Sequence, residues 1–390
     1  MSQKSALKNW KVWLGIAVSV VAMLLFLKDF REPEKREALL HAFREANYLW
    51  LVPAILVMYS SVYIRGMRWQ LFFRKIGHVS YNRLFGIEMV GFMGNSIFPL
   101  RAGELMRAYL LGRKEKIGLS SSIATIAMER FFDLVMVVIC FAAVSGVFNN
   151  VSEMINARVA EMAQSGLEPG KALLGLQVVF SWLPGFSRKL WIVIVAIVGG
   201  GLFALYAPRV CEKVVSIVLK AVPHHLRDGI LHVYRQFVLG LECLRDPQAI
   251  IMGSIYTALI WLTICYSEYL VIKAFDLDTM GIGPMEILFI MTLLAGAVAM
   301  PQGPGYIGVF QLVVAGTVGL LTHGQATPEM IERSEQTAPA FAIMLWFVQM
   351  IPIVLAGFVS LSFMGLSLTE LRHDAEETEE EMEEKTRHAT

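Results

Sequence analysis

The chain has 390 residues, of which 56% are apolar and 17% charged, with a mean hydropathy of +0.56. This composition excludes a single soluble domain and indicates a protein that crosses a membrane several times. The formal net charge of +1 gives no reason to expect a nucleic-acid partner, and the four cysteines form no C-x-x-C pair that would suggest a redox or metal site.

Apolar stretches long enough to cross a bilayer, which takes about 20 residues of helix, occur six times. Two further apolar stretches, 84–113 and 285–322, are each interrupted near the middle by Pro and Gly, as expected of two half-length segments. The six predicted spans are 12–27, 47–64, 119–148, 189–207, 249–272 and 338–364.

Lys and Arg cluster in the N-terminal tail and in 65–83, 101–116 and 209–245, and the positive-inside rule assigns these segments to the cytoplasm. Because 84–100 lies between two such segments, the first broken stretch is expected to enter and leave the membrane on the cytoplasmic side. By the same alternation, 285–322 starts and ends outside. Both termini are then cytoplasmic, and the expected location is a bacterial cytoplasmic (inner) membrane.

These assignments predict an all-α polytopic fold: six transmembrane helices and two re-entrant helical hairpins, arranged as an inverted repeat of two halves, 10–148 and 189–365. GNSIFPLRAG and GAVAMPQGPG share the spacing G-x-x-x-x-P-x-x-x-G, one in each hairpin. Paired interrupted segments of this kind indicate a transport site near the bilayer midplane. The membrane domain spans 1–365, and 366–390 is expected to be an acidic, disordered cytoplasmic tail.

The first hairpin contains charged residues spaced three apart: Arg101, Glu104 and Arg107, which lie on one face of a helix. One interpretation is an intrahelical ladder of ion pairs that neutralises itself. The other is a phosphate site, in which the arginines act together with the free N–H groups of a helix N-terminus. Charge at membrane depth favours the second interpretation.

The next predicted span contains Glu129, Arg130 and Asp133, with Arg130 and Asp133 at the i, i+3 spacing of an ion pair. Because an unpaired charge at this depth is costly, we expect an Arg/Glu/Asp network between this helix and the hairpin. For Glu129 and Asp133, a purely structural clamp and a functional role are both open.

Other polar signals have simpler interpretations. RGMRWQLFFRK, residues 65–75, is typical of an interfacial helix on an anionic leaflet. Glu268 lies near the outer end of its span, so it is expected to reach the headgroups or to act on the exit side. GPGYIG, residues 303–308, lacks the βαβ context of a dinucleotide site, so close packing or a hinge is expected there.

NSIFPLRAGELMRA (95–108), Ser120–Ser122, ERFFD (129–133) and PQGPGYIGVFQ (301–311) resemble the motifs of the lysylphosphatidylglycerol synthase flippase-like integral membrane family. Gln302 and Pro304 depart from the family's usual P-G-G-x-G. The resemblance covers most of 10–365 and implies movement of lipids or lipid-linked headgroups between leaflets, without synthesis. With the reasoning above, it predicts the following substrate-binding or translocation residues: Asn95, Pro99, Arg101, Gly103, Glu104, Arg107, Glu129, Arg130, Asp133, Pro301, Gly303, Gly305 and Gln311.

The leading hypothesis is a lipid flippase or scramblase, not an enzyme, in which the two hairpins meet and give a phosphate-bearing headgroup a polar path. Expected partners are membrane lipids, either anionic phospholipid or polyprenyl-phosphate-linked; a homodimer is left open. No cofactor or metal is expected, and the sequence contains no Walker A motif that would point to ATP. The alternatives are an ion-coupled transporter or channel for a small soluble anion, a noncatalytic scaffold for an envelope lipid or glycan enzyme and, less favoured, a lipid-modifying enzyme.

Overall fold

The computed structural model describes residues 10–74, 77, 79–98, 102–115, 117, 119–164, 246–299, 302–322 and 328–366, with single positions between 192 and 217. Across these ranges the chain is helical and forms no β-strand. The α-helices are α2 (Trp10–Lys28), α3 (Pro33–Glu45), α4 (Leu51–Phe73), α5 (Tyr81–Ile97), α6 (Gly103–Glu115), α7 (Leu119–Ala143), α8 (Ser145–Gln164), α12 (Pro247–Ala274), α13 (Pro284–Ala299), α14 (Val309–Thr322) and α15 (Pro328–Phe363). Short 3-10 helices lie at η1 (Asp29–Arg31), η2 (Tyr48–Trp50), η6 (Leu277–Met280) and η7 (Pro304–Tyr306).

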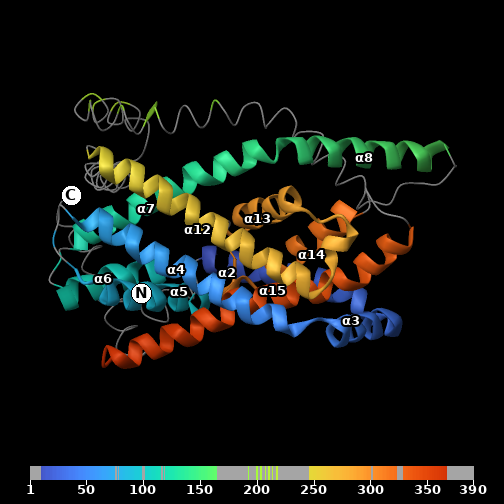
Figure 1. Cartoon of the computed structure of the whole chain (residues 1–390), viewed down its shortest axis with the longest axis horizontal. Coiled ribbons are helices and arrows are strands. Elements are labelled where there is room, and N and C mark those ends of the chain that lie inside the picture. Colours follow the sequence, from blue (N-terminus) through green and yellow to red (C-terminus); the bar gives the residue numbers. More distant parts are fainter. Residues whose placement is uncertain are drawn as a thin grey trace.

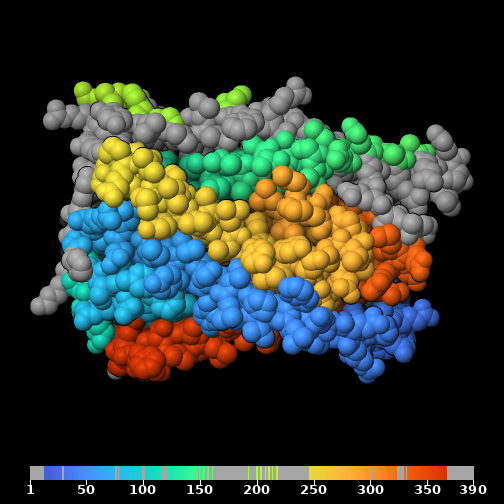
Figure 2. Space-filling model, in the orientation of Figure 1, coloured from blue at the N-terminus to red at the C-terminus, as the bar shows by residue number. Residues whose placement is uncertain are grey.

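Helices α4 and α12 form an antiparallel pair along one face of the bundle (Figure 2). The Asn47 N–H donates to the Ala274 carbonyl at 2.8 Å, and the Ser267 hydroxyl donates to the Ala54 carbonyl at 2.8 Å. The start of α4 therefore lies beside the end of α12. Figure 2 shows the two helices, blue and yellow, in continuous contact across this face of the molecule.

Two broken helix pairs lie at opposite ends of this bundle (Figure 1). The start of α5 and the end of α6 are joined by an ion pair between Arg83 and Glu115 at 2.7 Å, so this pair begins and ends at one end. The second pair starts with α13, just beyond the end of α12. It ends with α14, whose Thr322 contacts Ser334 near the start of α15 at 2.6 Å.

The two broken helix pairs fall in the stretches where the hairpins are predicted, and the re-entrant course of each pair stays a prediction. At about 1.5 Å per residue, α5, α6, α13 and α14, with 17, 13, 16 and 14 residues, are about 20–26 Å long, less than a bilayer core of about 30 Å. Each pair starts and ends at the same end of the bundle, as a hairpin requires. The order of long helix, broken pair, long helix occurs twice, in α4–α7 and in α12–α15.

The predicted spans are confirmed in part. Within the described ranges, four segments are long and apolar enough to cross a membrane: Tyr48–Phe73, Pro247–Ala274, Pro304–Thr322 and Glu332–Phe363. Three of these cover the spans predicted at 47–64, 249–272 and 338–364 to within one residue, whereas Pro304–Thr322 lies in the second broken stretch, where a hairpin is predicted. Helix α2 covers the predicted span 12–27 and is followed, after a bend of 96°, by α3, which would make a fifth candidate.

The span predicted at 119–148 corresponds mainly to α7, a continuous helix. Because α7 contains the charged residues Glu129, Arg130 and Asp133, it does not meet the same apolar criterion. The predicted span 189–207 and the predicted tail 366–390 lie outside the continuously described residues. The two-half domain boundaries therefore stay a prediction.

Two expectations about polar segments are wrong. Helix α4 continues through 65–73 instead of ending at the interface, and Arg68 and Trp69 on it are completely buried. Glu268 does not reach the headgroups: it is buried inside the bundle on α12. In both cases tertiary packing covers a segment whose sequence pattern is that of an exposed or interfacial one.

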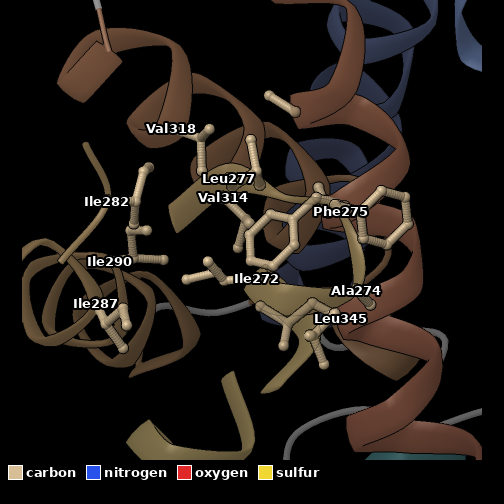
Figure 3. Close-up of a cluster of buried hydrophobic side chains, with 14 of the residues drawn as sticks. Ile272, Ala274, Phe275, Leu277, Ile282, Ile287, Ile290, Val314, Val318 and Leu345 are labelled. Atoms are coloured by element: carbon tan, nitrogen blue, oxygen red, sulfur yellow. The ribbon is translucent and has the colours of Figure 1, made fainter. Parts of the chain in front are cut away.

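The largest apolar core joins α12, α13, α14 and α15. Figure 3 shows Ile272 and Phe275 from the end of α12 pointing toward Ile290 of α13, Val314 of α14 and Leu345 of α15. A second core packs α5 and α6 against the end of α4. Each broken pair is thus held by its own apolar cluster, and this fixes the positions of the two breaks.

Candidate functional site

The first hairpin is closed by glycines at its crossing point. The Gly103 N–H at the start of α6 donates to Asn95 Oδ1 on α5 at 3.0 Å. A Cβ on Gly103 would overlap the carbonyl oxygen of Gly91 and would lie 2.8 Å from the backbone nitrogen of Asn95. Asn95 and Gly103, both predicted to bind substrate, therefore hold the two helices of the hairpin together.

A fully buried ionic cluster, here called the inner cluster, surrounds Arg107 of α6. Its Nη2 donates to Glu88 Oε2 on α5 at 3.0 Å and to Glu129 Oε2 on α7 at 2.9 Å. Its guanidinium carbon lies 3.9 Å from the centre of the Trp69 ring on α4, a cation–π contact. One side chain thereby connects four helices.

A second group, the outer cluster, is centred on Asp133 of α7. Its carboxylate accepts a hydrogen bond from Arg68 Nη1 at 2.7 Å and lies 3.6 Å from Arg65 and 3.7 Å from Arg130. Arg130 also lies 3.7 Å from Glu104 of α6. The side chains of Arg130 and Glu104 are 37% and 29% exposed, so this cluster, unlike the inner one, opens to the surface.

The two clusters differ in charge. Counting only the described residues, the inner cluster has one guanidinium group for two carboxylates, whereas the outer cluster has three guanidinium groups for two carboxylates. The pairs at 3.6–3.7 Å in the outer cluster are ionic contacts beyond hydrogen-bond length. An anion can therefore approach Arg65 or Arg130 without first breaking a good hydrogen bond. The predicted network between α7 and the hairpin is present, and its accessible part is the outer cluster.

The second break is held by neutral hydrogen bonds. The Gly303 N–H donates to Ser19 Oγ of α2 at 2.8 Å, and the Gly308 N–H donates to Gln311 Oε1 at 2.8 Å. Gly308 has φ +90°, which favours glycine, and directly precedes α14. Gly303 and Gln311, both predicted to contact substrate, here close the break and cap α14.

The two breaks approach each other. Gly305 adopts φ +68° in η7, and a Cβ on it would lie 3.7 Å from the Ser96 carbonyl oxygen near the end of α5. The indole N–H of Trp346 on α15 donates to the Gly305 carbonyl at 2.7 Å. At these residues the two breaks lie in contact, whereas their assignment to re-entrant hairpins stays a prediction. Pro99, Arg101 and Pro301 lie outside the described residues.

Sequence reasoning missed several members of the two clusters. Arg65, Arg68 and Trp69 were assigned to an interfacial helix because cations next to aromatic residues are typical of one. Glu88 gave a usable signal: it is the single acidic residue in the apolar stretch 84–100, and an ionisable group within such a stretch is functional or paired by default.

Within the described part of the chain, no group of three or more His, Cys, Asp or Glu residues is arranged to hold a metal ion. The carboxylates of the two clusters are arranged around arginines instead. The guanidinium groups, not the carboxylates, are the groups that can bind an anion.

Residues 12–357 match the family described as the lysylphosphatidylglycerol synthase TM region. A UPF0104 membrane protein of Methanothermobacter thermautotrophicus is 21% identical over 369 residues, which are 91% of this chain and 96% of that protein. Glycosyltransferase AglD of Haloferax volcanii is 23% identical over 365 residues; the match covers 91% of this chain but 54% of AglD. No solved structure is significantly similar. The match over nearly the whole chain confirms the resemblance seen in the motifs: this protein belongs to the family of the lysylphosphatidylglycerol synthase transmembrane region.

Proposed function

We propose that the protein moves a phosphate-bearing lipid, or a lipid-linked headgroup, between the two leaflets of a membrane, and that it does so without chemically changing the lipid. The outer cluster is the headgroup site. The single observation that carries the proposal is the excess of guanidinium groups around Asp133, on a surface that is partly open and lies among membrane helices. The family match supports a role connected with membrane lipids.

Arginine suits this task because its planar guanidinium group binds phosphate oxygens in pairs and stays charged. In the resting protein Asp133 occupies the place of the phosphate. Arg68 is the buried anchor of this carboxylate, since it also donates to Thr257 of α12 at 2.9 Å. When a headgroup binds, Arg65 and Arg130 release the Asp133 carboxylate and bind the phosphate instead. The acyl chains stay in the surrounding lipid.

The meeting of the two breaks supplies a route. A polar headgroup crosses the hydrocarbon at least cost where the helices are shortest, and the described break of the second pair lies against α5 of the first. In this proposal the headgroup passes from the outer cluster to the place where η7 lies against Ser96. The residues of the two breaks line the route, whereas the arginines bind the headgroup.

The test uses purified protein in sealed vesicles that contain an anionic phospholipid with a fluorescent headgroup. A membrane-impermeant quencher reports how fast label from the inner leaflet reaches the outer one. Losing a charge-assisted hydrogen bond costs about 1.5–3 kcal/mol, so Arg130→Gln and Arg65→Gln should each slow the movement about tenfold or more. Arg44→Gln, an exposed arginine on α3, is the matched control and should move lipid at the unmodified rate.

The outcomes separate the candidate functions. Vesicles with unmodified protein that move label no faster than protein-free vesicles would overturn the proposal. Movement that Arg130→Gln and Arg65→Gln both leave intact would show that the outer cluster is not the headgroup site. Uptake of a water-soluble phosphate or sulfate into the same vesicles, without lipid movement, would favour the soluble-anion transporter.

A further inference from the structure

A third buried acidic site lies on α12, away from both clusters. Glu268 is 1% exposed, and its Oε1 accepts a hydrogen bond from Gln349 Nε2 of α15 at 3.3 Å. Its Oε2 is buried and has no hydrogen-bond partner among the described residues. Leaving a buried acceptor without a hydrogen bond costs free energy, so its presence in a folded protein calls for a functional explanation.

The surroundings of Glu268 differ from those of the other buried carboxylates. Glu88, Glu129 and Asp133 each contact an arginine, whereas within the described residues Glu268 has no Lys, Arg or His within ion-pair distance. Its partner Gln349 is a neutral amide, and no metal-binding group includes it among the described residues. A carboxyl group in this setting can bind and release a proton without first breaking an ion pair.

The titratable side chains near this region are few. Cys265 lies about one turn earlier on α12, and its thiol contacts Met291 Sδ of α13 at 3.0 Å. Cys140 of α7 lies next to Cys265. At the end of α12, Lys273 pairs with Asp278 of η6. Within the described residues, the Gln349 amide is thus the one polar side chain in hydrogen-bond contact with Glu268, and the Cys265 thiol is the titratable group one turn before it on α12.

Glu268 is connected to the second break through α15. Gln349 lies one turn after Trp346, whose indole N–H donates to the Gly305 carbonyl in the break. Pro352 follows three residues later inside the same helix, where it lacks the N–H that would bond to the carbonyl of residue 348, so α15 can bend there. A movement of Gln349 can therefore be transmitted along less than two turns of α15 to Trp346 and, through its hydrogen bond, to Gly305 in the break.

We propose that Glu268 and Gln349 form a proton-binding site that couples lipid movement to a proton gradient. The inference rests on the proposed function. In one state the Glu268 carboxylate accepts hydrogen bonds from Gln349; in the other it takes one proton from water on one side of the membrane and becomes a neutral acid whose O–H can donate to Gln349. The exchange of donor and acceptor shifts α15 and the break, and the proton leaves to the other side. No other bond forms or breaks.

The first test measures the proton directly and does not need lipid movement. Infrared difference spectra of the full protein in lipid, recorded as the pH is varied, should contain the C=O band of a buried protonated carboxyl group. Glu268→Gln should lose this band, and Gln349→Leu should shift its frequency because the amide partner is gone. Glu286→Gln, a carboxyl group at the start of α13 that accepts from the Gly283 N–H at 3.1 Å, is the control and should keep the band.

The second test measures coupling in sealed vesicles with the membrane potential clamped to zero. For one proton per lipid, a pH difference of one unit can change the ratio of outward to inward lipid movement by up to about tenfold. Glu268→Gln should move lipid at a rate that no longer depends on the pH difference, and Glu286→Gln should respond like the unmodified protein. Helicity and elution as a single species confirm that each variant is folded.

Each result bears on one claim. If the unmodified protein moves no lipid at any pH difference, the proposed function fails, whereas the infrared band still reports on the proton site. If lipid moves but ignores the pH difference, or responds to a sodium gradient instead, proton coupling at Glu268 is wrong. A set of pH-dependent carboxyl bands that is identical in the unmodified protein and in Glu268→Gln would overturn the site itself.

Discussion

The helix pairs α5–α6 and α13–α14 begin and end at opposite ends of one bundle and close their breaks with different chemistry. The first pair is joined by buried ions around Arg107 and by glycine backbones in contact. The second is held by hydrogen bonds from neutral groups, such as the Gly308 N–H to Gln311. The similarity of shape therefore does not extend to the chemistry of the two halves.

This difference suggests a division of roles. Ion pairs buried in a bundle are costly to form and strongly destabilising to break, so they position groups precisely but resist movement. Neutral hydrogen bonds at glycines with positive φ, such as Gly305 and Gly308, can be exchanged at lower cost. In the proposed function, the ion-paired first break is thus suited to holding groups that bind the headgroup, and the hydrogen-bonded second break to moving.

The largest expected effect comes from removing the cation of the inner cluster. Arg107→Met keeps an unbranched stem of similar shape against Gly91 but leaves Glu88 and Glu129 buried without a positive partner. Breaking a buried ion pair in this way typically costs about 3–5 kcal/mol. The free energy of unfolding, measured by SDS titration in mixed micelles, should fall by this amount.

Two further variants test the physical reason for that loss. Glu129→Gln leaves one carboxylate for one guanidinium group, so it should cost less than Arg107→Met. Adding Glu88→Gln and Glu129→Gln to Arg107→Met removes the uncompensated charges and should recover much of the stability. If the triple variant is no more stable than Arg107→Met, charge is not what holds the first hairpin closed.

The sequence was sufficient to predict both breaks because Pro and Gly interrupt apolar stretches, and to predict a network at Glu129, Arg130 and Asp133 because charges inside an apolar helix need partners. It was not sufficient to predict that Arg68 is buried. The pattern around Arg68 is that of an interfacial helix, and what covers it is Asp133, 65 residues later in the chain. Burial of this kind depends on tertiary contacts that local pattern does not contain.

The next effect concerns the glycines of the two pairs. Gly103→Ala places a methyl group against the Gly91 carbonyl oxygen and the Asn95 backbone nitrogen of α5, and backbone atoms inside a helix cannot easily move aside. Overpacking of this kind costs about 1–3 kcal/mol. Gly316→Ala on α14 is the matched variant, since a Cβ there has no atom within 4 Å and faces a cavity of about 550 Å³. It should stabilise the protein by up to about 1 kcal/mol through helix propensity.

Thermal unfolding of the two variants in the same detergent separates these effects. A drop for Gly103→Ala together with a small rise for Gly316→Ala supports backbone contact as a specific feature of the first pair. Equal losses in both would mean that the two pairs pack alike and that the contrast between them is confined to charge.

The smallest effect is expected at Gln311, where prediction and structure assign different roles. As a translocation residue, Gln311 would affect lipid movement when replaced; as the cap of α14, it would affect stability. Gln311→Met removes the oxygen that accepts from the Gly308 N–H and should cost about 0.5–1.5 kcal/mol of unfolding free energy. Leu312→Met, next in the chain and exposed, controls for the change in side-chain shape and should cost less.

Once folded, Gln311→Met should move labelled lipid at the unmodified rate, because the Gln311 amide that it replaces faces the start of α14 and not the arginines. A loss of movement as large as that of Arg130→Gln, at unchanged stability, would instead place Gln311 in the path of the headgroup and extend the binding chemistry into the neutral half.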